Sequence, residues 1–229
     1  MIDFKYLSSG NEERIYDYLN NLSNCQGCFC TKSYVRFLHG VYGAPEVDIY
    51  INGNLAICNL DFSEITDYAL FYSGDYVISV YTAGETTNPL LNKTININRN
   101  TAYTAAIVGD LSNFGLDITK EYREDIPPIR EAVVAYTNYT PIDEGFDIAI
   151  SDGTLLYKDI TFQETMPNLR VFPDDEQFSL LYTGTDEIVA STPMIELQRN
   201  TYYTLYSLLK GDKVILLITL SGLNYLDLC

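Results

Sequence analysis

The sequence predicts an all-β protein made of two tandem antiparallel β-sandwiches, preceded by a short N-terminal helix. The first observation is a strand-like segment, residues 47–53, that returns about 100 residues later as residues 146–153. In both copies apolar residues alternate with others and the run ends in a Gly turn, which is typical of a half-buried strand entering a hairpin. The second observation is that short segments of this kind, separated by turn residues, recur along both halves, as in a sandwich.

The two copies extend well beyond this segment. The later matches are Phe62-Ser63-Glu64 with Phe162-Gln163-Glu164, Tyr81 to Gly84 with Tyr182 to Gly184, residues 99–104 with 199–204, and Gly109-Asp110 with Gly211-Asp212. The offset rises only from 99 (Val47 to Phe146) to 102 (Gly109 to Gly211), so insertions are confined to turns. A repeat of this length indicates two domains, because solenoid repeats are only a few tens of residues long.

Residues 1–33 precede the repeat and are predicted to form an arm with one helix. Residues 8–13 supply a helix cap followed by acidic side chains in the first turn. The apolar residues that then share one helical face are Ile15, Tyr18, Leu19 and Leu22. We therefore expect an amphipathic helix from about residue 11 to residue 22, which packs on the first sandwich or serves as a docking arm.

Cys25, Cys28 and Cys30 follow this helix, and closely spaced thiols can chelate zinc or copper(I) or exchange disulfides. The remaining soft ligands are not paired at metal spacing: Cys58, Cys229 and His39. The three cysteines are thus candidate metal ligands, but no metal or other cofactor is predicted. Reduced, silent thiols are the leading interpretation, and intermolecular disulfide cross-linking is the next, because five cysteines leave one unpaired in a monomer.

The first repeat is expected at residues 34–120. It opens with a strand at 34–40, and Asn52-Gly53 is a strong hairpin signal between the repeated segment and its return strand. Further strands are expected at 55–58, 68–71, 76–81, 94–97, 103–108 and 114–118. Seven or so short strands at this spacing favour a β-sandwich.

Residues 39–53 resemble the opening signature of the DUF4397 family, whose members typically have HASPDAPAVDVYVNG there. Later landmarks of the family resemble residues 81–84, 101–104 and 108–111, and the resemblance covers nearly all of 34–225 over both copies. It implies tandem immunoglobulin-like sandwiches, found mostly in bacterial exported or envelope proteins of unknown role. The second copy departs from the signature, because Thr137 to Pro141 stand where the family has His-Ala-Ser-Pro.

A charged linker is expected at residues 121–130, and the second repeat at 131–229. Pro127-Pro128 cannot join a strand ladder and stiffens the linker, so the two sandwiches should keep a limited range of orientations. Near the end of the second repeat, residues 213–220 are apolar on both faces. This run is expected to be central in a sheet or packed at the domain interface.

The chain carries 31 acidic and 14 basic side chains, a net charge of −17, which argues against nucleic acid and anionic lipid as partners. A cationic peptide, a polyamine or a divalent cation remains open, as does a role in solubility alone. No stretch is apolar enough for a membrane span. No secretory signal is visible, so synthesis in the cytoplasm is expected, with deposition at a cell surface or spore coat left open.

His39 is the only histidine and is expected in a strand-end loop without a nucleophile motif, so no catalytic residue is predicted. Asp48 and Asp147 occupy the same place in both copies. They are candidates for ligand binding, or for a structural pair with a turn donor or with Arg36. Residues 174–176 could offer calcium ligands, but the spaced pattern of a calcium loop is absent and surface solvation is favoured.

These observations favour a non-enzymatic structural or binding protein of a cell surface or spore coat. Protein or glycan partners and self-association fit its 20 tyrosines, since tyrosine suits strands and interfaces. One alternative is a metal-binding or thiol-redox protein that uses the N-terminal cysteines. The other is a carbohydrate-binding module, which would present a row of exposed tyrosines on one sheet face.

Overall fold

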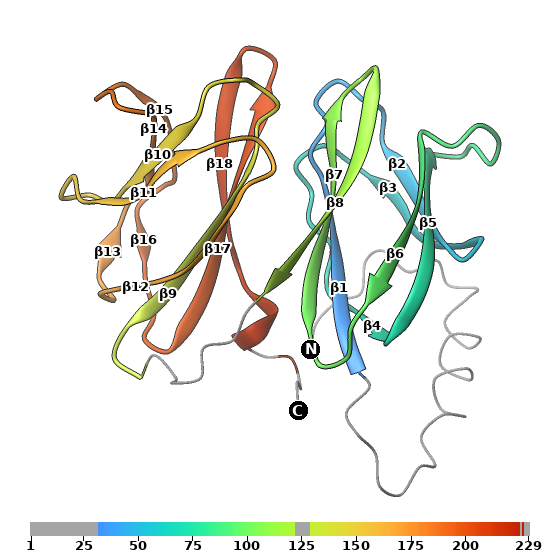
Figure 1. Ribbon diagram of the computed structural model, residues 1–229, viewed down its shortest axis with the longest axis horizontal. Helices are drawn as coiled ribbons and strands as arrows, with labels where there is room; N and C mark the ends of the chain where they lie inside the picture. The colour runs from blue at the N-terminus through green and yellow to red at the C-terminus, as the bar shows by residue number, and fades with distance from the viewer. Residues whose placement is uncertain (1–31, 122–128, 225, 227–229) are drawn as a thin grey trace, which may run out of the picture.

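The computed structural model describes residues 32–121, 129–224 and 226, and the regular elements in these ranges are strands apart from one 3₁₀ turn, η1 (Gly222–Asn224) (Figure 1). The first half contains β1 (Lys32–His39), β2 (Val47–Ile51), β3 (Asn54–Leu60), β4 (Ala69–Tyr72), β5 (Gly74–Thr82), β6 (Leu91–Ile97), β7 (Ala102–Asp110) and β8 (Asn113–Glu121). The second half contains β9 (Ala132–Tyr139), β10 (Phe146–Ala149), β11 (Leu155–Ile160), β12 (Thr165–Val171), β13 (Asp175–Glu176), β14 (Ser179–Tyr182), β15 (Ile188–Ser191), β16 (Ile195–Glu196), β17 (Thr201–Lys210) and β18 (Lys213–Leu220). The predicted all-β class is confirmed.

The strands of the first half form two four-stranded sheets, in the orders β4-β1-β7-β8 and β3-β2-β5-β6. Alternate side chains of both sheets meet in one buried core, which includes Phe37 from the first sheet and Ile49 and Ile78 from the second. This packing follows from the alternation in the sequence, because successive side chains of a strand point to opposite faces.

The second half has the same arrangement, with sheets β12-β9-β17-β18 and β11-β10-β14-β15 around a core that includes Tyr136, Phe146 and Leu205. A two-stranded sheet, β13-β16, is added. In each half one neighbouring pair is parallel, β1 with β7 and β9 with β17. The expectation of purely antiparallel sheets is wrong at these pairs, because the chain crosses through the other sheet before it returns.

The tips of the two long hairpins correct the sequence match of Gly109-Asp110 with Gly211-Asp212. Asp110 pairs with Asn113 and Lys210 pairs with Lys213, so the tips are 111–112 and 211–212. Gly109 (φ 105°) therefore lies inside β7, where a Cβ would approach the Asn113 carbonyl oxygen to 2.2 Å. Gly211 (φ 66°) is itself a tip residue. The sequence match therefore pairs a glycine inside a strand with a glycine at a hairpin tip, and the two positions are not equivalent.

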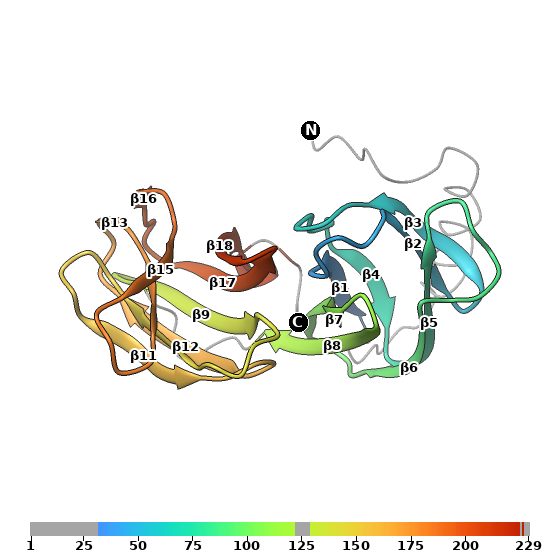
Figure 2. The same cartoon turned by 90° about the horizontal axis from the view of Figure 1, so that it is seen from above.

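The halves pack through their sheets β4-β1-β7-β8 and β12-β9-β17-β18, which form the two inner layers of a four-layered molecule (Figures 1 and 2). The apolar part of this seam includes Leu38 and Val108 from the first half and Tyr139, Tyr206 and Leu208 from the second. The closing run of the chain is the edge strand β18 and packs into the seam through Ile215 and Leu217. The expected central place is thus wrong and the expected interface packing is found.

Several expectations fall outside the described residues: the helix at about 11–22, the cysteines 25, 28, 30 and 229, and the linker from 122 to 128. The expected linker begins one residue early, because Glu121 is the last residue of β8 and is buried. The first half has eight strands, and each overlaps one of the segments expected from the sequence. Among the described residues, no helix has the length and apolar character needed to cross a bilayer.

Candidate binding groove between the two halves

Arg36 of β1 lies in the seam with only 2% of its surface exposed. Its Nε donates a hydrogen bond to Thr104 Oγ1 (2.9 Å), and its Nη1 donates to the Leu220 carbonyl oxygen (3.0 Å) and to Thr219 Oγ1 (3.3 Å). Its Nη2 donates to Tyr206 Oη (3.1 Å) and forms an ion pair with Glu121 Oε1 (3.3 Å). One guanidinium of the first half is thus bonded to side chains and backbone of both halves.

Glu121 completes this niche from the end of β8. Its Oε1 accepts hydrogen bonds from Arg36 and from the Tyr68 hydroxyl. Its Oε2 accepts from Ser221 Oγ (2.6 Å) and from the backbone N–H of Gly222 (3.0 Å). A buried charge pair is tolerated when its remaining hydrogen-bonding capacity is satisfied, and this one meets that condition.

Aromatic rings enclose the pair. The Arg36 guanidinium lies 4.7 Å from the Tyr68 ring centre, and the Tyr139 and Tyr206 rings stack at 5.7 Å. Burial lowers the pKa of Arg36, but Tyr206, Tyr68 and Glu121 outweigh it and the net pKa lies above its usual value. Burial raises the pKa of Tyr68 and of Tyr139, and neighbouring carboxylates, Glu121 and Asp117 respectively, raise it further. The arginine is therefore charged and the phenols neutral at ordinary pH.

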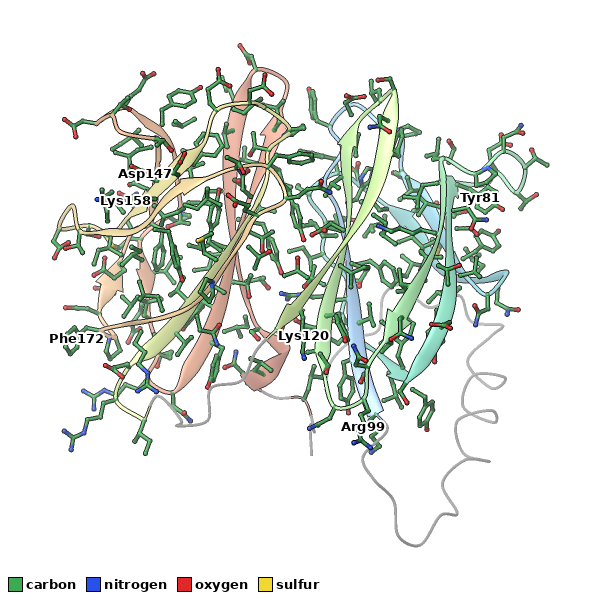
Figure 3. The ribbon with its side chains drawn as sticks, in the orientation of Figure 1. Tyr81, Arg99, Lys120, Asp147, Lys158 and Phe172 are labelled. Carbon is green, nitrogen blue, oxygen red and sulfur yellow. The ribbon has the colours of Figure 1, made fainter. Side chains whose placement is uncertain are left out.

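Beside this closed niche the seam opens into a groove of about 410 Å³. Its walls come from β8 of the first half and from β9, β12 and β17 of the second. The polar side chains on these walls include Asp117, Thr119, Thr137, Thr165, Asn168 and Thr204. Lys120, the one cationic side chain among the lining residues, is exposed and lies at the seam in Figure 3. The groove thus presents hydroxyl, amide and carboxylate groups beside apolar side chains such as Met166 and Leu223, and it depends on both halves for its shape.

Two polar groups of the groove are available to a ligand. Thr204 is only 4% exposed, and its hydroxyl has no hydrogen bond within the part of the chain that the structure describes. Asp117 accepts hydrogen bonds from Tyr139 Oη (3.0 Å) and Thr119 Oγ1 (3.2 Å) through Oδ2 alone. The Thr204 hydroxyl and the second carboxylate oxygen of Asp117 can therefore bond a molecule that enters the groove.

A second hollow of about 350 Å³ lies at the hairpin tips, lined by residues that include Tyr42, Leu111, Pro141 and Leu209. Tyr42 is 48% and Leu111 59% exposed. The Tyr42 ring contacts Phe62 edge to face at 5.3 Å. This hollow is apolar and lacks a buried polar group that would orient a ligand, so the larger groove is the better candidate.

His39 is the last residue of β1 rather than a loop residue, and it is completely buried. Its Nδ1 accepts a hydrogen bond from the Val41 N–H (3.3 Å), and its Nε2 lies 3.4 Å from the Pro45 carbonyl oxygen. Burial lowers the pKa of the imidazole below 6.5, against the opposing effect of Pro45. In the second half Asn138 takes this place, with its Oδ1 accepting from the Thr140 N–H (2.8 Å). His39 therefore organises a turn.

Asp48 and Asp147 also have turn-forming roles. Asp48 accepts hydrogen bonds from the N–H groups of Asn59 (2.9 Å) and Gly84 (2.9 Å). Asp147 accepts from those of Asp159 (2.8 Å) and Gly184 (3.2 Å). The predicted pairing with turn donors is found in both halves. The suggested partner Arg36 is wrong, because that side chain crosses the seam.

The remaining sequence candidates are scattered. Asp174 Oδ1 accepts from the N–H of its neighbour Asp175, and Glu176 Oε2 accepts from the Ser151 N–H. Cys58 is a free, half-buried thiol of β3. Within the described ranges, no group of three or more His, Cys, Asp or Glu side chains is arranged for a metal ion.

The tyrosines Tyr50 and Tyr81 contact each other edge to face at 5.2 Å on β2 and β5 of the first half, and Tyr81 lies far from the seam (Figure 3).

Sequence reasoning missed the residues that matter most at the seam. Arg36 and Glu121 are 85 positions apart and no local motif joins them. Thr204 had appeared only as part of a repeated block. The one available signal was the repeat itself, because aligning its copies places Ala135 opposite Arg36.

Comparisons with known proteins give a family and distant structural likenesses. Residues 33–136 match DUF4397, described as a domain of unknown function. No curated protein sequence matches the chain. Solved structures with some similarity include the Bacillus anthracis TIE protein (9% identity, TM-score 0.23), a CBM26 module of Eubacterium rectale Amy13K in complex with maltoheptaose (11%, 0.23), and a candidate cell adhesion protein of Bacteroides fragilis (10%, 0.21).

The matches cover 81%, 83% and 82% of this chain respectively. They cover 97% of each of the last two proteins but only 34% of the TIE protein, so this chain spans about a third of that protein's length. TM-scores this low do not establish a shared fold, and the likenesses carry no argument about function.

Proposed function

We propose that the protein, whose residues 33–136 match the DUF4397 family model, is a non-enzymatic binding protein with its ligand site in the groove between its two halves. The observation that carries the proposal is the groove of about 410 Å³ between the halves, with the Thr204 hydroxyl on its wall free to accept a hydrogen bond. Ligand sites are typically concave and already formed, with a few well-placed polar groups. The buried Arg36–Glu121 pair beside the groove holds its walls together.

The engagement of the reactive side chains supports a binding role over catalysis. The imidazole of His39 and the carboxylates of Asp48 and Asp147 all accept hydrogen bonds from backbone N–H groups that form turns. A general base needs a geometry in which it can reach a substrate proton. These three groups are turned toward the protein backbone instead.

We assign each half, as a finer part of the same proposal, to an immunoglobulin-like sandwich and the chain to a tandem repeat of it. The matching strand orders of the two halves support this assignment. Determination of the structure by crystallography tests it, because superposition of residues 32–121 on 129–224 should align β1 to β8 with their counterparts. Poor superposition of the inner sheets would overturn the repeat.

Methyl NMR offers a direct test of the binding role, because two of the three methionines are well placed as reporters. Met166 lines the groove, whereas Met194 is 59% exposed and does not line it. A panel of amines, short peptides and oligosaccharides is titrated into protein labelled at the methionine methyl groups. At least one class should shift Met166 and leave Met194 unchanged. Shifts of Met194 alone, or turnover of a panel compound, would contradict the proposal.

A role at a cell surface or spore coat extends the proposal. Disulfide cross-linking through Cys25, Cys28 and Cys30, residues outside the described ranges, would join copies of the protein into a layer. Light scattering with and without reductant tests this, and oligomers that reductant dissolves and that a triple Cys→Ser variant lacks are expected. A monomer in both conditions would overturn the layer. Stoichiometric zinc or copper in the purified protein would instead favour the metal-binding alternative.

A carbohydrate ligand is the second candidate, since hydroxyl and amide groups line the groove and the Tyr50–Tyr81 pair offers aromatic faces elsewhere. The oligosaccharide arm of the methyl titration separates the two sites. Shifts at Met166 place the sugar in the groove. Binding that is lost in Tyr81→Ala, with Met166 unmoved, places it on the outer sheet.

A further inference from the structure

The seam between the halves has the pattern of a two-fold interface. Arg36 of β1 reaches Thr219 and Leu220 of β18, and Thr119 of β8 reaches Tyr139 of β9. Since β9 and β18 hold the places of β1 and β8 in the second half, the contact from β1 to β18 returns as one from β9 to β8. At the level of strands, this reciprocity is the pattern of an isologous interface. The seam therefore contains two equivalent niches, one on each side of the axis.

Strand registers identify the equivalent residues without ambiguity. In the first half Arg36 pairs with Thr104, which pairs with Thr119 across β1, β7 and β8. In the second half Ala135 pairs with Thr204, which pairs with Thr219 across β9, β17 and β18. Alanine thus stands where the other niche has its arginine.

The residues around Arg36 have counterparts that line the open groove. The groups that bond or cover the guanidinium are Tyr68, Thr104, Glu121, Thr219 and Leu220, together with Tyr206. The second niche has Thr204, Thr119 and Lys120 at the same registers, with Asn168 in β12 and Ser221 directly after β18. All five line the groove together with Ala135. The groove is therefore the second-half counterpart of the Arg36 niche. It keeps the threonines, whereas the arginine, its counter-charge Glu121 and the Tyr206 ring are replaced by Ala135, Ser221 and Ala106.

Thr104 and Thr204, which occupy equivalent positions in the two niches, differ in their hydrogen bonds. Thr104 Oγ1 accepts hydrogen bonds from Arg36 Nε (2.9 Å) and from Tyr206 Oη (2.9 Å). Thr204, 4% exposed and in the same register, has no hydrogen bond from its hydroxyl to any described residue. Asp117 adds to the groove a carboxylate whose Oδ1 accepts no hydrogen bond from described residues, and Glu121 adds a second carboxylate to the wall.

We propose that the groove binds a guanidinium group from another molecule in the position that Arg36 holds in the first niche. The inference rests on the proposed binding function. The ligand's N–H groups would donate to Thr204 Oγ1 and to Asp117, which is oriented by Thr119 and Tyr139. Free arginine derivatives and an arginine side chain in a partner peptide share this chemistry. The net charge of −17 favours the approach of either.

The geometry of the first niche favours guanidinium over ammonium. Arg36 donates in three directions at once, through Nε, Nη1 and Nη2, to acceptors on three separate strands. A planar fork of five donors meets such a set, whereas an ammonium is a point charge with three rotatable donors. The same backbone registers are repeated at the groove, so lysine-type ligands should bind more weakly than arginine-type ligands.

Isothermal titration calorimetry on the full chain tests the proposal with arginine amide, lysine amide and citrulline amide, the last being an uncharged isostere. Arginine amide should bind, lysine amide should bind about tenfold more weakly, and citrulline amide should show no binding. The binding of arginine amide should shift Met166 and not Met194 in the methyl spectrum. Equal binding of all three compounds would overturn the guanidinium assignment.

Ala135→Arg is the most informative variant, because its own guanidinium group would occupy the position that we assign to the ligand. It should abolish arginine binding and should not lower the unfolding midpoint. Ala83→Arg, a half-exposed site in the first half that is not among the groove residues, adds the same charge and should leave binding unchanged. Thr204→Val keeps the shape and should weaken binding about tenfold, which gives a readout if Ala135→Arg fails to fold. Wild-type affinity in both groove variants would overturn the proposal.

Two further results distinguish a small-molecule ligand from a protein partner, and the guanidinium inference from the broader binding function. A peptide with one internal arginine that binds at least tenfold more tightly than arginine amide indicates a protein partner, and equal binding indicates a small molecule. If another ligand class shifts Met166 and arginine derivatives do not, the guanidinium inference fails and the binding function survives. If no class shifts Met166, both fail.

Discussion

The two halves of this protein share their strand order and registers, yet one niche of the seam is closed and the other open. Arg36 fills the first, and Ala135 leaves the second as a groove. The backbone and the central threonines are the same in both. The difference teaches that the same backbone registers can carry a closed, charge-paired niche or an open groove, depending on the few side chains that differ between the halves.

The largest loss of stability is expected when the Arg36–Glu121 ion pair of the closed niche is broken. Arg36→Ala should lower the free energy of unfolding by about 3–5 kcal/mol, because it leaves the buried Glu121 carboxylate without its counter-charge. Urea denaturation measures it. Arg170→Ala is the control, since its ion pair with Glu131 (3.0 Å) has side chains 36% and 32% exposed and should contribute less than about 1 kcal/mol.

The double variant Arg36→Ala/Glu121→Ser sharpens this prediction. It gives the first niche the residues found at Ala135 and Ser221, and removes the unpaired carboxylate. It should therefore be more stable than Arg36→Ala alone. If the double variant is the less stable of the two, the cost of an unpaired Glu121 is not what destabilises the single variant.

An intermediate loss of stability is expected when the turn carboxylate of either half is removed, and the loss should be similar in both halves. Asp48→Ala and Asp147→Ala each leave two turn N–H groups without their acceptor, and each should cost about 1–3 kcal/mol of stability. The two values should lie within about 1 kcal/mol of each other, because the hydrogen bonds are equivalent. A larger gap in urea denaturation would argue against equivalent turns. Asp→Asn at either position keeps one acceptor and should cost less.

The smallest effect depends on pH and concerns His39. Burial holds its folded-state pKa below 6.5, so the unfolded chain takes up a proton first as the pH falls. The histidine therefore destabilises the fold progressively below pH 6.5, until the lowered folded pKa is reached. His39→Asn copies Asn138, and should stay within about 1 kcal/mol of wild type at pH 7.5.

The pH dependence of stability should differ between wild type and His39→Asn. The stability of wild type relative to His39→Asn should fall between pH 7.5 and pH 5.5, by about 1.4 kcal/mol for each pH unit below 6.5 until the folded-state pKa of His39 is reached. Denaturation of both proteins across this range measures it, and the common titration of their carboxylates cancels in the difference. Parallel curves would show that His39 is not held neutral by the fold.

Strands were the part of the fold that the sequence predicted well. Apolar alternation and the Asn52-Gly53 turn located most of them, because both depend on residues close in the chain. The parallel pairs β1-β7 and β9-β17 were missed, since they join segments about 70 residues apart. The hairpin tips were matched two residues out of register, because glycine identity was weighed without its backbone conformation.

The site was largely beyond sequence reasoning. Arg36 had been considered as a partner of Asp48, a nearby acid, whereas its counter-charge Glu121 had been placed in a linker. Ion pairs across a seam depend on how whole sheets meet, which no local pattern encodes. Thr204 gained its meaning only from Thr104, once the registers had made the two equivalent.

Joining the halves in one chain has a consequence for how such a site can arise. In a homodimer with this seam every substitution occurs twice, so an arginine would close both niches and an alanine would open both. A covalent duplicate is free of that symmetry. One half can then keep the contact between the halves while the other serves a different role. The Arg36 niche and the groove at Ala135 would be such a pair under the binding function that we propose.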